Sequence, residues 1–258
     1  MAIYKNTPPI ITNGLVLNLD AANVKSYPGS GTTWTDLSGN RLNGTLTNNT
    51  YSTLGGGNIA FNGSNSVVGL GDNDLFSFTS GGGVDLPFSV SCWVRLTAYG
   101  SGVSAFSMFV AKSQYNGAAW IREWAFGQVN ATGLVFNIFN PDTSGTTYIG
   151  RLVGSPLSLN VWYHFAATYS GSKTTSGINL YINGVLQSTA TNVSGGTYTG
   201  MGNTATTVEL GRQYSAGATD NGYFSGNISN VLIYKNKVLS ASEVLQNYNA
   251  LKSRYNLS

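Results

Sequence analysis

The sequence predicts an all-β protein. Short apolar runs alternate with turn residues from Gly14 to about Lys237, which is the pattern of successive strands. Charged residues make up only 9% of the 258 residues, and the 33 glycines together with Ser, Thr and Asn carry the polar share. These residue types favour turns and sheet surfaces over long helices. A helical bundle or a coiled coil is therefore excluded.

The expected strands follow one another along the chain. They lie within residues 14–20, 58–70, 87–96, 106–112, 123–128, 134–140, 162–169, 178–189, 207–212 and 227–235. Asn62-Gly63 marks a turn inside the second of these stretches. Asn183-Gly184 gives the clearest hairpin, because this dipeptide suits a type I′ turn between two β-rich arms. No repeat of about 20–50 residues is visible, which argues against a propeller or a solenoid.

Within residues 87–96, alternation places Phe88 and Cys92 on one face and Trp93 on the other. Cys92 is the single cysteine, so no intrachain disulfide forms, and we expect it to be buried as a small apolar side chain. His164 is the single histidine, and it alternates with apolar neighbours on an expected strand. It is interpreted as a sheet residue.

The chain is expected to form one domain, residues 13–258, preceded by an arm, residues 1–12. Pro8-Pro9 removes two backbone donors from the arm and enforces extended geometry. A C-terminal helix is expected at about 240–254, because Ser240 and Glu243 have the spacing of a capping box.

The predicted helix has one apolar stripe, formed by Val244, Tyr248, Leu251 and Tyr255. Lys252 and Arg254 follow in its last turn, where they complement the helix dipole. The stripe favours packing against the chain's own sheets; contact with a neighbouring subunit is the alternative.

Four stretches carry a family resemblance: residues 14–46 ("GLVLNLDAANVKSYPGSG…"), 60–71, 162–187 and 208–251. In this order they resemble the laminin-G-like, or concanavalin A-like lectin (glucanase), jelly roll in the version common in bacteriophage virion proteins. The resemblance implies a two-sheet antiparallel jelly-roll sandwich with binding loops on one rim. Such a fold hosts many functions, so function has to be argued from the residues.

A catalytic function is not expected. Glucanases that share this fold carry E-x-D-x-x-E on one strand, where alternate residues place nucleophile and acid/base on one face. The three glutamates here, Glu123, Glu209 and Glu243, each stand alone. Asp72-Asn73-Asp74 has the alternate spacing but lies in a turn-like segment without a glutamate. We therefore expect no catalytic residues.

The resemblance also implies a structural calcium between the first and last strands. The carried-over ligand position is Ser229 in "GNISNVLIY", where many relatives have an aspartate. A neutral hydroxyl is a poorer ligand than a carboxylate, because calcium prefers charged oxygens. Asp20 and Asp36 are the possible partners. Histidine and cysteine are too few for zinc.

A carbohydrate site would combine an aromatic platform with amide or carboxylate partners. The candidates come from two loop-rich stretches: Tyr115, Asn116, Trp120, Arg122 and Trp124 in one, and Tyr214, Asp220, Asn221 and Tyr223 in the other. The two stretches are expected to meet at one rim if sugar is bound. The alternative is that Trp120 and Trp124 pack in the sandwich or at a subunit contact, and alternation alone does not decide which.

The remaining expectations concern the setting of the protein. The 13 Lys and Arg residues are scattered singly, so nucleic-acid binding is not expected. Neither a signal peptide nor a membrane-spanning run is visible. The resemblance implies a non-enzymatic virion structural protein made in the host cytoplasm, most simply a capsid decoration that contacts other virion proteins through residues 1–12 and forms a homo-oligomer. The alternatives are a tail module that recognises bacterial surface glycans and a free lectin.

Overall fold

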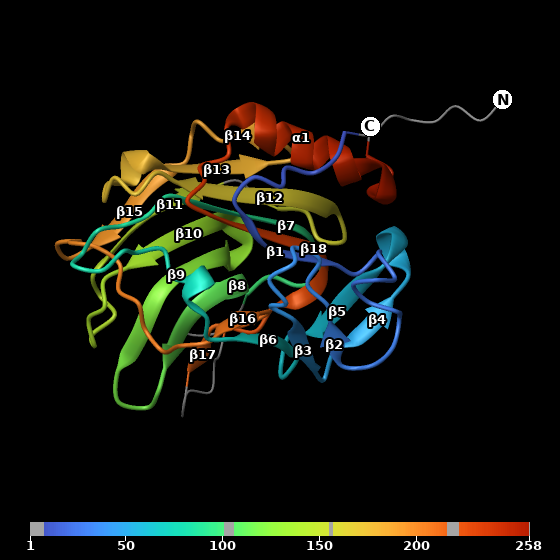
Figure 1. Cartoon of the computed structure of the whole chain (residues 1–258), viewed down its shortest axis with the longest axis horizontal. Helices are drawn as coiled ribbons and strands as arrows, with labels where there is room; N and C mark the ends of the chain where they lie inside the picture. The colour runs from blue at the N-terminus through green and yellow to red at the C-terminus, as the bar shows by residue number, and fades with distance from the viewer. Residues whose placement is uncertain (1–7, 101–105, 155–156, 216–221, 258) are drawn as a thin grey trace.

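The computed structural model describes residues 8–100, 106–154, 157–215 and 222–257. Two antiparallel sheets pack face to face, with one helix on the outside of the smaller sheet (Figure 1). The jelly-roll sandwich expected from the sequence is therefore confirmed. The helices in the described part of the chain are too short and too polar to cross a bilayer.

The smaller sheet has eight strands in the order β14-β13-β12-β7-β18-β5-β4, with β1 also paired to β18. Their bounds are β1 Leu15–Asp20, β4 Thr50–Ser52, β5 Asn58–Asn62, β7 Phe88–Leu96, β12 Trp162–Tyr169, β13 Ile178–Ile182, β14 Val185–Leu186 and β18 Ser225–Lys235. β18 lies at the centre: one edge pairs with β7, and the other is shared by β5 and β1. The first and last strands of the chain are thus neighbours.

The larger sheet has ten strands in the order β15-β11-β10-β9-β8-β16-β6-β3-β2, with β17 also paired to β8. Their bounds are β2 Thr33–Trp34, β3 Gly44–Thr47, β6 Val67–Gly71, β8 Phe106–Tyr115, β9 Trp120–Val129, β10 Gly133–Phe139, β11 Tyr148–Val153, β15 Thr191–Gly195, β16 Val208–Leu210 and β17 Tyr214–Ser215. Short 3-10 turns at 54–56, 74–76, 130–132 and 175–177 connect some of these strands.

The two predicted turns, at Asn62-Gly63 and Asn183-Gly184, make different connections. Asn183 and Gly184 both have positive φ, 52° and 79°, and close the β13–β14 hairpin as expected for a type I′ turn. The Asn62-Gly63 turn carries the chain from β5 in the smaller sheet to β6 in the larger one. It is a corner of the sandwich, because its two strands pair with different neighbours.

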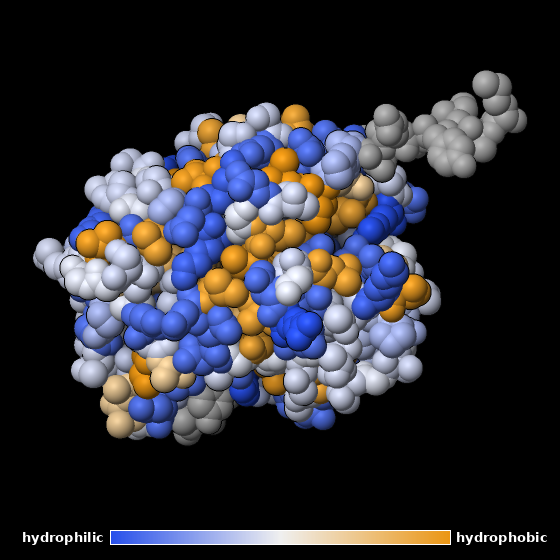
Figure 2. All heavy atoms as spheres, in the orientation of Figure 1, coloured by the Kyte–Doolittle hydropathy of each residue, from blue (hydrophilic) through white to orange (hydrophobic). Residues whose placement is uncertain are grey.

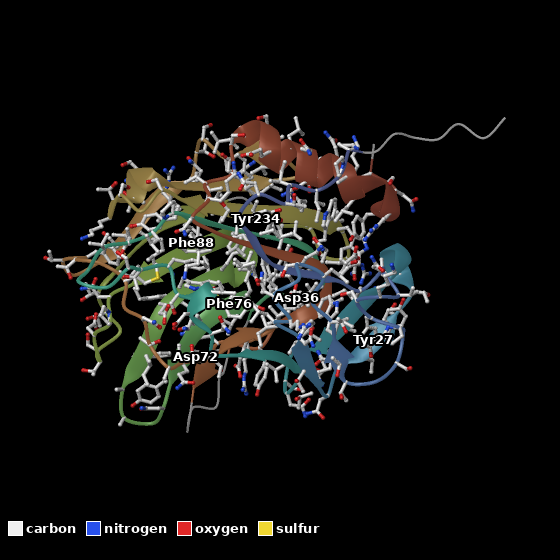
Figure 3. The ribbon with its side chains drawn as sticks, in the orientation of Figure 1. Tyr27, Asp36, Asp72, Phe76, Phe88 and Tyr234 are labelled. Atoms are coloured by element: carbon white, nitrogen blue, oxygen red, sulfur yellow. The ribbon has the colours of Figure 1, made fainter. Side chains whose placement is uncertain are left out.

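The core lies between the sheets and is rich in aromatic rings. Phe88, Cys92 and Val94 of β7 are fully buried in it, whereas Trp93 points to the opposite face. Phe88 stacks on Phe78 at 3.8 Å (Figure 3 labels Phe88). The alternation predicted for residues 87–96 is thus the one observed.

The C-terminal helix α1, Ala241–Leu251, continues as a 3-10 turn, Lys252–Tyr255. Ser240 and Glu243 form both hydrogen bonds of the capping box. The apolar stripe packs on the outer face of the smaller sheet, where Tyr255 stacks on Trp93 at 4.1 Å. Hydrophobic residues gather around α1 and the strands beneath it in Figure 2. The helix therefore covers its own sandwich, and His164 of β12 is buried under it.

Part of the predicted arm, residues 8–12, packs on the domain itself. The amide of Ile11 donates to Asn247 Oδ1 at 2.8 Å, and Tyr234 Oη donates to the Ile11 carbonyl at 3.0 Å. Ile10 and Ile11 also pack against the apolar cluster under α1. Both backbone groups of Ile11 therefore have partners within the chain, whereas residues 1–7 lie outside the described part.

Candidate functional site

The larger sheet has an outer face with its own side-chain cluster. Strand register places Ala111, Ala125, Asn137 and Gly150 side by side across β8 to β11. Ala111 and Ala125 belong to an apolar cluster distinct from the core, together with Phe139. Ala111 and Ala125 are each only 1% exposed, so the accessible side chains of this face lie away from the centre of the row.

Two bulges decide which residues reach this face. The β8–β9 register jumps once after Met108 and once after Lys112, so Phe109 and Glu123 are extra residues in their strands. Because of the second jump, Arg122 pairs with Ser113 whereas Trp124 pairs with Lys112. Arg122 consequently lies on the outer face, and Trp124 points into the core.

Aromatic rings and one arginine gather where β8 and β9 end; we call Tyr115, Trp120, Arg122, Phe139 and Tyr148 the aromatic corner. The Arg122 guanidinium lies 3.3 Å above the Trp120 ring centroid and 4.9 Å from that of Phe139. Tyr115 contacts Trp120 with centroids 5.2 Å apart, and Tyr148 contacts Phe139 at 5.8 Å. All but Phe139 are half-buried, so the corner presents fixed rings to solvent.

The 140–147 segment holds the corner in place. The amide of Trp120 donates to the Thr143 carbonyl at 3.0 Å, and Arg122 Nη1 donates to the Gly145 carbonyl at 3.2 Å. Gly145 has a φ of 64°, and a Cβ there would stand 2.6 Å from the Trp120 ring. Only glycine therefore fits against this ring without displacing it. Burial lowers the pKa of Arg122 to about 10, opposed by Asp142 and Tyr148.

A charged pair, Glu209 and Arg212, lies on the same face beyond Ala111. Glu209 of β16 pairs with Ala111, and its neighbours Val208 and Leu210 point into the core. Arg212 holds both Glu209 oxygens, Nε to Oε2 at 2.6 Å and Nη2 to Oε1 at 2.7 Å. Its Nη1 donates to Tyr223 Oη at 3.2 Å. Hydrogen bonding to Glu209 is the main cause that raises the pKa of Arg212.

The structure brings part of the predicted sugar site together. Tyr115, Trp120 and Arg122 share the corner, and Asn116 caps the hairpin turn by accepting from the amides of Ala118 and Ala119. β17 runs beside β8, pairing Tyr214 with Gln114 and Ser215 with Tyr115. The two predicted stretches therefore meet. Tyr223 orients Arg212, and Asp220 and Asn221 lie outside the described residues.

Trp124 does not belong to this face. It is fully buried, its Nε1 donates to the Phe76 carbonyl at 2.9 Å, and its ring packs against Phe78 and Phe88. Strict alternation would put the side chains of Trp120, Arg122 and Trp124 on one face of the sheet. The extra residue at Glu123 moves Trp124 to the opposite face from Arg122. A stacking role of Trp124 with sugar is therefore wrong.

The residues expected around calcium do not fit this ion. Arg254 Nη1 donates to both oxygens of Asp20, at 2.7 and 2.9 Å. Asp36 accepts four hydrogen bonds, from the amides of Asn18, Ser38 and Leu42 and from the Ser38 hydroxyl (Figure 3). Ser229 Oγ donates to the Gly57 carbonyl at 2.6 Å. No cluster of metal-ligating side chains occurs among the described residues. An arginine supplies the positive charge beside Asp20.

Sequence patterns missed a buried charge cluster between the sheets. Lys112 is fully buried and lies 3.0 Å from Glu123 Oε1, which is also fully buried, and 2.8 Å from Asp72 Oδ1. Thr204 donates to Glu123 through its amide at 2.7 Å and its hydroxyl at 2.8 Å. Burial raises the pKa of Glu123, although Lys112 opposes this. Asp72 and Phe76 lie on the segment after β6 (Figure 3).

Every carboxylate in the described part of the chain has a protein partner. The pairs are Asp20 with Arg254, Asp36 with backbone amides, Asp72 and Glu123 with Lys112, Asp74 with Asn203, Asp85 with Tyr169 and Tyr198, Asp142 with Ser144 and Gly145, Glu209 with Arg212, and Glu243 with Lys237. Asp72 and Glu123 share a partner, but Glu123 is closed to solvent.

One protein family matches the sequence: residues 62–245 match the concanavalin A-like lectin/glucanases superfamily. No curated protein sequence matches the chain significantly.

Several solved structures share the fold at low identity. Trypanosoma rangeli sialidase in complex with sialic acid has a TM-score of 0.63 at 16% identity, covering 97% of this chain and 36% of that chain. A botulinum neurotoxin type C structure, described as dependent on two ganglioside molecules for cell entry, has a TM-score of 0.61 at 16% identity. The match covers 93% of this chain and 52% of the neurotoxin chain. Domain 4 of the Geobacillus stearothermophilus arabinanase AbnA, in complex with arabinotriose, has a TM-score of 0.54 at 18% identity. The match covers 91% of this chain and 98% of that domain. The chain spans about a third of the sialidase chain.

Proposed function

The chain belongs to the concanavalin A-like lectin/glucanases superfamily, and from that premise we propose that it is a non-catalytic carbohydrate-recognition module. Its ligand lies on the outer face of the larger sheet, beside the aromatic corner. The observation that carries this proposal is the gathering of Tyr115, Trp120 and Tyr148 on one side of the sheet, away from the core.

The chemistry of the corner suits a sugar. The apolar face of a pyranose or furanose packs on aromatic rings, and ordered rings lose little entropy on binding. Trp120 is fixed by Arg122 above it and by Gly145 beside it, so it is held ready. Ser113 and Asn137 lie on the same face, but Ser113 Oγ and Asn137 Oδ1 are buried, so the accessible part of the site is aromatic.

The carboxylates support a binding role over hydrolysis. A glycosidase places two carboxyl groups about 5–10 Å apart on either side of the scissile bond. In the described residues each carboxylate is held by an arginine, a lysine, a tyrosine, a polar side chain or a backbone amide. Glu209 faces the proposed ligand, but Arg212 occupies both of its oxygens.

Three structural neighbours are described with sialic acid, gangliosides and arabinotriose. Their identity to this chain is too low to carry a ligand across, but they supply a first set of probes. We expect the purified chain to bind at least one immobilised glycan on an array that includes arabinan and sialylated oligosaccharides. It should release no reducing ends from the bound glycan. Absence of binding across the array, or release of reducing ends that Glu209→Gln abolishes, would contradict the proposal.

A second proposal concerns the place where the module acts. The resemblance of residues 14–46 and the low content of charged residues favour a component of a bacteriophage particle, either a capsid decoration or a receptor-binding tail module. Attachment would involve other virion proteins and residues 1–12, and assembly into a homo-oligomer is expected. Labelled antibody against this chain should stain intact particles on the head or the tail. Staining of neither part would contradict this placement.

A further inference from the structure

We propose that the outer face of the larger sheet selects neutral glycans over acidic ones; this rests on the proposed function. Recognition of a uronic or sialic acid carboxylate needs an arginine or lysine with donors directed at the ligand. Two arginines lie on this face: Arg212 is paired with Glu209, and Arg122 is stacked against two rings with its Nε buried.

Arg212 is neutralised by Glu209. Two of its nitrogens form a forked pair with both carboxylate oxygens, and the third donates to Tyr223 Oη. Such a bidentate pair is among the stronger arrangements of charged groups. Since Glu209 stands in the row beside Ala111, a ligand carboxylate placed there would meet a negative charge as well as the arginine.

Arg122 is held by stacking. It lies between the Trp120 and Phe139 rings, with Nη1 on the Gly145 carbonyl. Asp142 holds the same turn by accepting from the Gly145 amide and the Ser144 hydroxyl, which places a carboxylate near the guanidinium. The positive charge of Arg122 is therefore balanced next to the aromatic corner.

The nearest lysine on these strands does not serve this face. Lys112 points to the opposite side of β8, where it is fully buried between Glu123 and Asp72. The groups left for a ligand are uncharged: the half-buried rings of Tyr115, Trp120 and Tyr148. Aromatic rings suit the apolar faces of sugars without a net charge.

The test compares neutral probes (arabinan, galactan, mannan and β-glucan oligosaccharides) with acidic probes (polygalacturonate, alginate and sialylated oligosaccharides). Binding is measured at low and at high salt, about 0.05 and 0.5 M NaCl, because charge recognition is screened by salt. We expect binding to a neutral probe, with an affinity that changes by less than about twofold between the two salts. Glu209→Gln releases Arg212 and should add salt-sensitive binding to acidic probes.

Glu243→Gln is the matched control, because it removes the same charge from the helix cap on the other sheet. It should leave the ligand preference unchanged. Binding of the wild-type chain to acidic probes alone, with an affinity that falls about tenfold or more at high salt, would overturn the inference but leave the proposed function standing. Binding to no probe would overturn both.

Discussion

Asp20 and Arg254 join the first strand to the end of the chain across 234 positions of sequence. Arg254 Nη1 lies 2.7 and 2.9 Å from the two Asp20 oxygens, and the Asp20 side chain is only 10% exposed. The pair occupies the region where the family resemblance implies calcium. It ties the 3-10 turn after α1 to the centre of the smaller sheet.

Arg254→Ala should therefore lower the stability of the domain. Removing the arginine leaves a mostly buried carboxylate unpaired, and we expect a loss of about 1–2 kcal/mol, because Arg254 itself is partly exposed. Thermal melting measures the change. A chelator should leave the melting temperature of the wild-type chain unchanged. A fall with EDTA that calcium restores would show that a metal, and not Arg254, balances Asp20.

Lys112→Met should destabilise the fold in a pH-dependent way. It leaves the buried Glu123 without its cation, at a cost of about 3–5 kcal/mol near pH 7. Burial already raises the pKa of Glu123, and Lys112 opposes this rise, so the variant raises it further. An acid whose folded pKa is raised stabilises the fold at low pH and loses that contribution as pH rises through the folded pKa.

The free energy of unfolding of Lys112→Met, from urea titrations, should consequently be greater at about pH 5 than at about pH 7, relative to the wild-type chain. In the Lys112→Met/Glu123→Gln double variant this difference should vanish, because the buried carboxylate beside position 112 is gone. An equal dependence on pH in the single and double variants would contradict the assignment to Glu123.

Trp124→Ala and Trp120→Ala should have different effects, the first on the stability of the domain and the second on glycan binding. Trp124 is fully buried, its ring packs against Phe78 and Phe88 and its Nε1 donates to the Phe76 carbonyl, so its truncation should cost about 3–5 kcal/mol. Trp120 is half-buried at the start of β9, and its truncation should cost less while it abolishes glycan binding. Calorimetry of both variants beside a binding assay measures this. Equal losses of stability would place Trp120 in the core.

Shortening the N-terminus in two steps tests how the arm is held. Deleting residues 1–7 keeps every contact of residues 8–12 and serves as the reference. Deleting residues 1–12 also removes Ile10 and Ile11 from the cluster under α1 and leaves Asn247 without its amide donor. We expect this second deletion to cost about 1–3 kcal/mol. If both truncated proteins have the melting temperature of the full chain, the contacts of residues 8–12 contribute nothing to stability.

The sequence predicted the fold well because most of its signals are local. Alternation predicted the two faces of β7, and Asn183-Gly184 predicted the β13–β14 hairpin. The Ser240–Glu243 capping box predicted the start of α1. Each depends on residues close together in the chain. The same signals cannot say which sheet a strand joins, so the crossing at Asn62-Gly63 needed the structure.

The site was harder to predict for physical reasons. A bulge adds one residue without a clear sequence mark, and the bulge at Glu123 sends Trp124 inward while Trp120 stays outside. The meeting of Asp20 with Arg254, and of Lys112 with Glu123 and Asp72, depends on contacts between distant segments. Composition revealed the aromatic and amide residues of the site but not their partners.

The most direct test of carbohydrate recognition at the aromatic corner follows the tryptophan indole N–H signals by NMR during titration with a glycan that binds. Each signal is assigned by one Trp→Phe variant. Trp34, Trp93, Trp124 and Trp162 are at most 8% exposed, whereas Trp120 is half-buried beside Tyr115. We expect the Trp120 signal to shift and to saturate with the binding curve while the other four signals stay in place. A Trp120 signal that stays fixed while the glycan binds would contradict it.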